Sequence, residues 1–234
     1  MSAQKLQIVT WNCPNKSLEQ AIQIIEKNIG KRPDILVIQE INEPVMDSSN
    51  SCCVFQKSSN KGVVIVSFNG YTLEKYTMNE DVPDFFIPVK INGPVFFNLL
   101  AVWTQKTPKY IESVQTAINS YQNFLKSASS VVLGDFNSNS VWDYKYRKFN
   151  HSIMVKELNE RFDLVSSYHS GTGFEQGKEK HPTLYWRWNK DSQFHIDYCF
   201  VPKMWQVESV EIGTFEKWSE YSDHCPLIVD LVIN

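Results

Sequence analysis

The chain lacks the cysteine pattern of a disulfide-bonded secreted protein. The 234 residues contain five cysteines, an odd number, and no Cys-x-x-Cys motif. The chain does not open with the basic and then apolar residues of a secretion signal. We therefore expect reduced thiols in a cytoplasmic protein. Cys52-Cys53 could form a reactive pair, but a strand residue beside a loop residue is the simpler interpretation.

Long apolar runs and a strong excess of charge are missing as well. No segment approaches the roughly 20 apolar residues that a membrane-spanning helix needs, so we expect no membrane association. The formal net charge is −3, which gives no overall electrostatic case for nucleic-acid binding. A local basic groove remains compatible with that charge.

Apolar residues, in contrast, are plentiful. They make up 42% of the chain and aromatic residues make up 13%, enough for a sizeable core. No internal repeat, low-complexity tract or linker divides the sequence. A chain of this length is typical of one α/β domain, so we expect residues 1–234 to form a single domain without an obligate protein partner.

The first part of the chain predicts a strand–helix–strand unit. Leu6–Trp11 is rich in β-forming residues and alternates in character. Ser17 and Gln20 form a capping box before an amphipathic helix that ends at Gly30. Ile35–Ile38 is an uninterrupted apolar run, typical of a strand buried on both faces. Such a unit implies a crossover connection and some parallel pairing.

The middle of the chain predicts an antiparallel meander. Asn69-Gly70 and Asn92-Gly93 are strong hairpin signals, and each separates two runs with strand character. The expected strands are Gly62–Phe68, Tyr71–Tyr76, Phe85–Ile91 and Val95–Thr104.

Helices and strands alternate in the second half. One helix is expected to start at Thr107-Pro108, with an apolar face that reaches Leu125, and another from Ser152 to Phe162. Gly171–Lys180 predicts a polar loop. The strands expected here are Val131–Leu133, Thr183–Trp188, Phe194–Val201, Val207–Gly213 and Leu227–Ile233. Strands flanked by helices predict a layered α/β sandwich.

Polar side chains recur where the predicted strands end. The strand at Val131–Leu133 stops at Gly134, and Asp135 and Asn137 follow it. Taken alone, this is an ordinary exit into a turn, because Gly, Asp and Asn are favoured turn residues. Other polar residues lie within or just beyond predicted strands: Asn12, Glu40, Asp197, Asp223 and His224.

Each of these residues has a purely structural interpretation. Asn12 could be a turn residue, and Glu40 the solvated end of a strand. Asp197 could satisfy a buried polar group, and His224 could be a satisfied histidine at the sheet rim. Four carboxylates and an imidazole at strand ends are better explained together, as one site.

The residue types at these positions suit metal-assisted phosphate chemistry. Hard divalent cations such as Mg²⁺ take oxygen ligands, which Glu40, Asp223 and the amide oxygen of Asn12 would provide. Asp135 could act as a base or as a ligand of a second ion. An imidazole such as that of His224 suits a position near a phosphoryl centre.

Five motifs, in this order, resemble those of the endonuclease/exonuclease/phosphatase superfamily. Its members include exonuclease III-type apurinic endonucleases, deoxyribonuclease I, neutral sphingomyelinases, inositol-polyphosphate 5-phosphatases and deadenylases. The resemblance runs from residue 9 to residue 229, nearly the whole chain. The motifs are Val9-Thr10-Trp11-Asn12, Val37-Ile38-Gln39-Glu40, Gly134-Asp135-Phe136-Asn137, His195-Ile196-Asp197-Tyr198 and Ser222-Asp223-His224-Cys225-Pro226.

The resemblance implies an α/β fold, a four-layered sandwich of two mixed β-sheets flanked by helices. It also implies phosphoester hydrolysis that depends on Mg²⁺ or Mn²⁺. By motif matching, Glu40 would be the principal metal ligand, helped by Asn12 and Asp223.

The same matching assigns the remaining site residues. Asp135 would orient or deprotonate the attacking water, and Asn137 would contact the scissile phosphate. His224 would donate to the phosphoryl oxygens while Asp197 holds its other ring nitrogen. One position departs from the family pattern: Trp103 stands where the family has a histidine or tyrosine that contacts the phosphate. An indole N–H can donate a hydrogen bond but cannot carry a proton.

The substrate class stays open between two enzymatic hypotheses and one binding hypothesis. The leading hypothesis is a nuclease acting on DNA or RNA, since the motif at Ser222–Pro226 is most similar to exonuclease III-type enzymes. The alternatives are a phosphatase or phosphodiesterase of a small soluble phosphorylated ligand, and a degenerate binding protein that has lost turnover. The expected substrate-binding residues are Trp103, Lys148 and Trp186. A groove that stacks bases and neutralises phosphates would use Tyr144, Tyr146, Arg147, Lys148, Lys178, Lys180, Trp186, Arg187, Trp188 and Lys190.

Overall fold

The computed structural model describes residues 3–42, 52–55 (backbone only), 61–77, 81–106, 109–145 and 148–234. The expected helix start at Thr107-Pro108 lies outside these residues, and so do Tyr146 and Arg147 of the expected groove. In the described part, no helix is long and apolar enough to cross a membrane.

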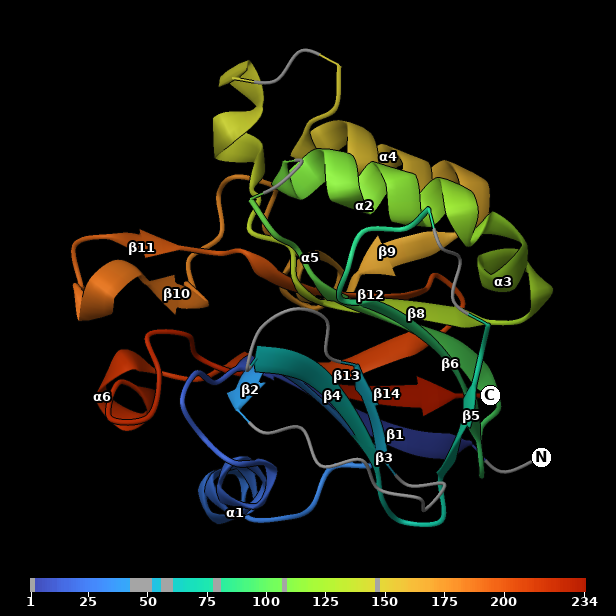
Figure 1. The fold of residues 1–234 in the computed structure, drawn as a ribbon, viewed down its shortest axis with the longest axis horizontal. Coiled ribbons are helices and arrows are strands. Elements are labelled where there is room, and N and C mark those ends of the chain that lie inside the picture. Colours follow the sequence, from blue (N-terminus) through green and yellow to red (C-terminus); the bar gives the residue numbers. More distant parts are fainter. Residues whose placement is uncertain (1–2, 43–51, 56–60, 78–80, 107–108, 146–147) are drawn as a thin grey trace.

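Two mixed six-stranded sheets pack face to face in the described part of the chain (Figure 1). The first sheet has the order β13-β14-β1-β2-β4-β3, and β1 and β2 pair in parallel. Its strands are β1 (Gln4–Asn12), β2 (Ile35–Asn42), β3 (Cys52–Phe55), β4 (Lys61–Ser67), β13 (Gln206–Ile212) and β14 (Leu227–Ile233).

The second sheet has the order β5-β6-β7-β8-β12-β9, with β7 and β8 parallel. Its strands are β5 (Thr72–Lys75), β6 (Phe86–Asn92), β7 (Phe97–Trp103), β8 (Ser130–Asp135), β9 (Leu164–Ser166) and β12 (Asp197–Pro202). A separate two-stranded hairpin, β10 (Leu184–Tyr185) and β11 (Gln193–Phe194), projects from the side of the molecule (Figure 1).

Helices cover the outer faces of both sheets (Figure 1). On the second sheet lie α2 (Tyr110–Ser120), α3 (Gln122–Ser127) and α4 (His151–Phe162), and on the first lie α1 (Leu18–Ile29) and α6 (Phe215–Trp218). The short helix α5 (Ser167–Thr172) follows β9. The expected four-layered α/β sandwich is confirmed. The capping box of Ser17 and Gln20 and the left-handed Gly30 bound α1 as predicted.

Separate apolar clusters fill the spaces between the layers. On β8, Val131 belongs to the cluster between the sheets, whereas Val132 belongs to the cluster beneath α2 and α4. On β1, Ile8 lies in the cluster between the sheets and Val9 lies in the cluster beneath α1. Burial on both faces explains why these central strands are uninterrupted apolar runs.

The predicted four-strand meander is wrong at its first turn. Asn69-Gly70 does not join a hairpin, because β4 lies in the first sheet and β5 in the second. Both edges of β4 already pair, with β2 and β3, so β5 has no free edge of β4 to join. The turn at Asn92-Gly93 does join paired strands, β6 and β7, as predicted. Both residues of Cys52-Cys53 lie in β3, so the expected strand-and-loop pair is also wrong.

Two of the late strands are shorter than expected. The strand predicted at Thr183–Trp188 stops after Tyr185 and gives way to a 3₁₀ turn in which Arg187 has a positive φ of 54°. The strand predicted at Phe194–Val201 is split between β11 and β12. The Thr183 hydroxyl accepts hydrogen bonds from the backbone N–H groups of residues 196 and 197, so a side chain replaces the sheet partner there.

Candidate active site

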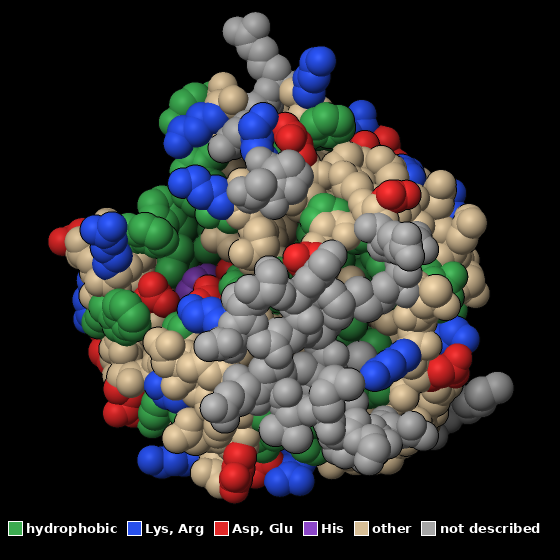
Figure 2. Space-filling model, viewed as in Figure 1, with side chains coloured by type: hydrophobic (Ala, Val, Ile, Leu, Met, Phe, Trp, Pro, Cys, Tyr) green, Lys and Arg blue, Asp and Glu red, His purple; other side chains and the backbone are tan. Residues whose placement is uncertain are grey.

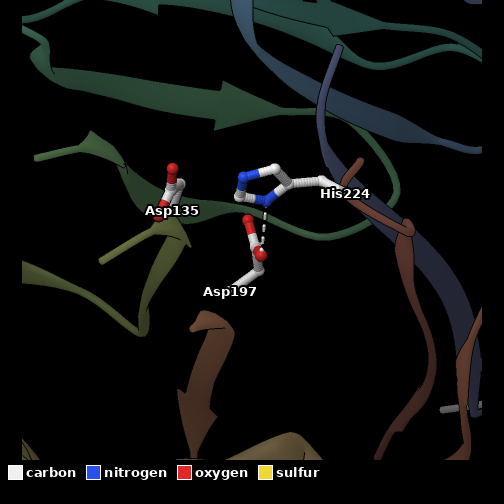
Figure 3. A group of neighbouring side chains, drawn as sticks. All are labelled: Asp135, Asp197 and His224. Carbon is white, nitrogen blue, oxygen red and sulfur yellow. Dashed lines mark hydrogen bonds and ion pairs between the residues drawn. The ribbon is translucent and has the colours of Figure 1, made fainter. Parts of the chain in front are cut away.

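Three buried ionisable groups meet at one end of the two sheets. Asp135 on β8 and Asp197 on β12 face each other in the antiparallel register of the second sheet. His224 arrives from the loop before β14, a strand of the first sheet, and its Nδ1 lies 3.0 Å from Oδ2 of Asp197 (Figure 3). Ligand atoms of the three residues lie within 4.8 Å of one another. His224 and Asp197 therefore lie in contact, as the expected dyad requires.

The charges at this site shift the pKa values of His224 and Asp135. Burial lowers the pKa of His224, but Asp197, with Asp135 and Asp223, raises it to about 10. Burial and the Asp197 charge raise the pKa of Asp135 to about 7. These charges favour the protonated imidazole of His224, with Nδ1 facing Asp197 and Nε2 left for a ligand. The same three side chains could also hold a metal ion.

The backbone around Asp135 fixes where its carboxylate lies. Gly134 has φ +138°, and a Cβ at that position would lie 1.9 Å from the carbonyl oxygen of Val102. Only glycine allows β8 to approach β7 this closely. Asn137, with φ 46°, turns back so that its backbone N–H donates to Oδ1 of Asp135 at 2.8 Å and its Nδ2 donates to Oδ2 at 2.9 Å.

Asn12 and Glu40 reach the same place from the first sheet. Nδ2 of Asn12 donates to Oδ2 of Asp135 at 3.0 Å and to Oε1 of Glu40 at 3.2 Å. Glu40 has φ 61° at an irregularity in the pairing of β2 with β4, between Ile38 and Ile41. Bulges of this kind re-aim a side chain, and here the redirected carboxylate meets Asn12. The other Glu40 oxygen accepts from Nζ of Lys61 at 2.5 Å.

The loop that carries Asp223 and His224 is tied to β1 by hydrogen bonds. Oγ of Ser222 donates to the carbonyl oxygen of Asn12 at 2.8 Å, and Nε1 of Trp11 donates to that of His224 at 2.9 Å. Burial raises the pKa of the Asp223 carboxyl, and the nearby Glu40 and Asp197 charges raise it further, against the opposing effect of His224. These tethers hold the loop at the site.

The donor set fits a hard divalent cation. Oδ1 of Asn12 is buried and has no hydrogen-bond partner in the described part of the protein, although the amide nitrogen on the same group is fully used. A buried carbonyl oxygen without a donor needs a partner, which a cation would supply. The carboxylates of Glu40 and Asp223 add the oxygen ligands that such an ion prefers.

A cavity of about 400 Å³ opens beside Asn137. Aromatic rings form part of its wall, with the ring centroids of Trp142 and Phe194 5.1 Å apart. Trp186, an expected substrate-binding residue, also lines it. In Figure 2 a hollow on this face contains histidine and acidic surface, and hydrophobic and basic side chains gather along its upper rim.

Two other expected substrate-binding residues, Trp103 and Lys148, do not line this cavity. Trp103 pairs with Asp135 in the register of β7 and β8, but its ring packs on Phe85, 4.6 Å between centroids, and only 7% of the residue is exposed. It belongs to the apolar cluster between the sheets, and its contact with substrate stays a prediction. Lys148 is exposed and does not line the cavity.

Sequence reasoning missed Lys61 and the aromatic wall. Lys61 lies opposite Asn42 in the pairing of β4 with β2, a register that the sequence alone does not reveal. Trp142 stands in a stretch of interleaved aromatic and basic residues, which is a usable signal for a binding surface. Thr183, which organises the start of β12, gave no signal at all.

Sequence comparison identifies the family. A model of the Endonuclease/Exonuclease/phosphatase family matches residues 9–224. The chain belongs to this family. Its members are hydrolases of the phosphoesterase or nuclease type, and the resemblance seen in the motifs is confirmed. A search of curated proteins found no match to the chain.

Solved structures of the Endonuclease/Exonuclease/phosphatase family share the fold. The 3'-5' exonuclease NExo from Neisseria meningitidis is 17% identical, with a TM-score of 0.66 over 96% of this chain and 98% of that chain. The human Nocturnin catalytic domain is 16% identical, with a TM-score of 0.67 over 97% and 93%. Truncated TDP2 from Caenorhabditis elegans is 12% identical, with a TM-score of 0.65 over 98% of each chain. At these identities the likeness supports the fold alone.

Proposed function

We propose that this protein is a divalent-metal-dependent nuclease that cleaves phosphodiesters of DNA or RNA by attack of water. One observation carries the proposal: the two sheets bring the buried His224–Asp197 pair, the carboxylate of Asp135 and the oxygen donors of Asn12 and Glu40 to a single point. A structural role alone gives no reason for so many desolvated charges in one place, since their burial is costly.

Each group has a chemical task that its surroundings favour. His224 donates from Nε2 to a phosphoryl oxygen, where negative charge develops in the transition state, while Asp197 fixes the ring through Nδ1. Asp135, with a pKa of about 7, is suited to orient the attacking water and accept its proton. Asn137, which lines the cavity beside Asp135, contacts the scissile phosphate.

The metal would be held by Glu40, Asp223 and the carbonyl oxygen of Asn12. Mg²⁺ or Mn²⁺ bound there would supply Lewis-acid polarisation of the phosphoryl oxygen and offset its negative charge. Lys61 keeps one Glu40 oxygen hydrogen-bonded, which orients the carboxylate.

Nucleic acid is the substrate that the surroundings favour. The aromatic wall and Trp186 offer ring faces for a base or sugar beside Asn137. NExo from Neisseria, which shares the fold, is described as a 3' phosphatase bound to a product DNA hairpin. A groove along a substrate strand would also use Lys148, which is exposed.

A small phosphorylated ligand is the second candidate, and the ion pairs of the surface favour it. Lys109 lies 2.8 Å from Glu112, and Lys190 pairs with Glu216. Such pairs reduce the positive charge available to a long phosphate backbone, while the cavity is large enough for a mononucleotide-sized ligand.

A substrate panel tests the proposal. Plasmid, abasic duplex, single-stranded DNA and RNA, inositol phosphates and nucleotides are each incubated with the wild-type protein, with Mg²⁺ or with EDTA. We expect Mg²⁺-dependent cleavage of at least one polynucleotide. Hydrolysis of inositol phosphates or nucleotides alone would support the second candidate and overturn the nuclease assignment.

A further inference from the structure

Two tryptophans stand exposed at the tip of the β10–β11 hairpin. Trp186 is 53% exposed and Trp188 is 52% exposed, whereas Trp11 and Trp218 are buried. Large aromatic side chains in water usually mark a binding surface when they lie close together. A neighbouring cation is Arg187, whose guanidinium lies 5.7 Å from the Trp186 ring centroid.

The backbone holds these rings outward at a conformational cost. Arg187 and Trp188 have φ of 54° and 58°, in the left-handed region that side chains other than glycine disfavour. Backbone hydrogen bonds close the tip, from Trp186 N–H to the Ser192 carbonyl at 2.8 Å and from Ser192 N–H to the Asn189 carbonyl at 3.0 Å. These hydrogen bonds fix the backbone that carries the two tryptophans.

The hairpin continues the wall of the active-site cavity. Trp186 lines the cavity together with Trp142 and Phe194, and the same cavity reaches Asn137. Lys145, whose Nζ lies 5.4 Å from the Tyr144 ring centroid, also lines it. Ring faces and cations thus line the cavity from Asn137 to Trp186, and Trp188 follows two residues further along the hairpin tip. In Figure 1 the hairpin projects from the sandwich at the end of the sheets where β2 terminates.

We propose that Trp186 and Trp188 stack on unpaired bases and make the enzyme prefer single strands or unpaired ends to continuous duplex. The inference rests on the proposed nuclease function and adds its strand preference. A base exposes its ring face to a protein only when it is unstacked from its neighbours, and aromatic stacking does not depend on base identity. Arg187 adds a cation that suits the adjacent phosphates.

Binding without turnover tests the hairpin by itself. In EDTA, a single-stranded 20-mer should quench the intrinsic tryptophan fluorescence of the wild type, and Trp188→Ala should weaken its binding by about 10-fold or more. Binding of the matched duplex should change far less. Trp188→Tyr should restore most of the affinity, because a phenol ring also stacks. Phe96→Ala is the matched control, since Phe96 is a 51% exposed aromatic residue at the turn between β6 and β7, and it should change neither affinity.

Turnover separates this inference from the proposed function. With Mg²⁺, Trp188→Ala should lower kcat/KM for single strands about 10-fold, mainly through KM. The variant should therefore lose the wild-type preference for single strands over duplex. Unchanged single-strand binding and kinetics in Trp188→Ala, or equal losses on single strands and duplex, would overturn the stacking role while leaving the nuclease in place. If Trp188→Ala loses single-strand binding but the wild type cleaves no polynucleotide, the proposed nuclease function is overturned and the stacking role stands. A third outcome would also overturn the inference. If the wild type binds no oligonucleotide but sediments with phosphatidylcholine–phosphatidylserine vesicles, and Trp188→Ala abolishes that sedimentation, the tip binds a lipid surface instead.

Discussion

The Asp135 carboxylate receives hydrogen bonds from both sides of the sandwich. Asn137 donates to it from the turn after β8, and Asn12 donates from the end of β1 in the other sheet. The position of this carboxylate therefore depends on the close approach of β8 to its neighbours, which in turn depends on Gly134.

Replacing Gly134 with alanine should destabilise the fold strongly. The added Cβ would meet the carbonyl oxygen of Val102 at 1.9 Å, and alanine is also strained at φ +138°. We expect a loss of about 3 kcal/mol or more in the free energy of unfolding. Gly30→Ala is the control, since Gly30 has φ +78° but open space around it, and it should cost only about 1–2 kcal/mol. Urea unfolding of both variants checks this. Equal losses would mean that backbone strain, and not the close approach, makes Gly134 necessary.

At the scale of single residues, the sequence identified most of the side chains that form the site but not all of the residues in contact with them. Asp135, Asp197 and His224 could be picked out because each lies in or beside a recognisable strand or motif. Trp103 ends β7 opposite Asp135, but the packing of its ring on Phe85 depends on register, which a single sequence does not reveal. Lys61 escaped for the same reason.

At the scale of secondary structure, the site residues lie at or near the ends of strands. The carboxyl ends of β1, β2 and β8, the start of β12 and the loop before β14 supply its residues. Local turn chemistry predicted the first strands and α1 well, since caps and periodicity are local signals. It failed at Asn69-Gly70, because a tight turn is also compatible with a chain that passes between two sheets.

Four of the five histidines lie around the rings of Tyr168 and Tyr198, with His151 at the start of α4, and they predict an acid-sensitive fold. Burial lowers the pKa of His151 and of His195 to about 4. His151 contacts Oγ of Ser138 at 3.0 Å and Gln176 Oε1 at 3.2 Å. Each buried ring is more easily protonated in the unfolded chain, where the pKa is 6.5, than in the folded protein.

The stability that these two histidines contribute is complete above pH 6.5 and is lost as the pH falls towards 4. In that window, the free energy of unfolding of the wild type should fall with pH more steeply than that of His151→Gln, by up to about 1.4 kcal/mol per pH unit. Urea unfolding of the two proteins at several pH values measures the difference. Parallel curves would show that His151 titrates normally in the folded protein.

The site lies at one end of the sandwich of the whole molecule. The start of β1 and the end of β14 lie at the other end (Figure 1). The four layers could be anticipated from the family motifs, because the motifs name a fold that is already known. The hairpin and the cavity could not, since they arise where segments distant in sequence meet.

Lys148 should contribute to nucleic-acid affinity through charge alone. We expect Lys148→Ala to weaken binding of a single-stranded oligonucleotide at low salt and to reduce the slope of log K against log salt by about 0.7. Lys5→Ala is the control, because the exposed Lys5 lies near the start of β1, at the opposite end of that strand from Asn12. A slope equal to that of the wild type would place Lys148 outside the substrate path.

The central claim is that Glu40 belongs to a metal-dependent phosphoester-cleaving site, and one pair of variants tests it most directly. Glu40 and Glu74 are both paired with lysines, Lys61 at 2.5 Å and Lys90 at 2.6 Å, but only Glu40 lies at the site. The measurement is the Mg²⁺-dependent kcat on the best substrate of the panel, with the thermal melt recorded alongside. Glu40→Gln should lower kcat by at least about 100-fold with little change in Tm, and Glu74→Gln should retain wild-type kcat. Full turnover by a folded Glu40→Gln variant would contradict the account.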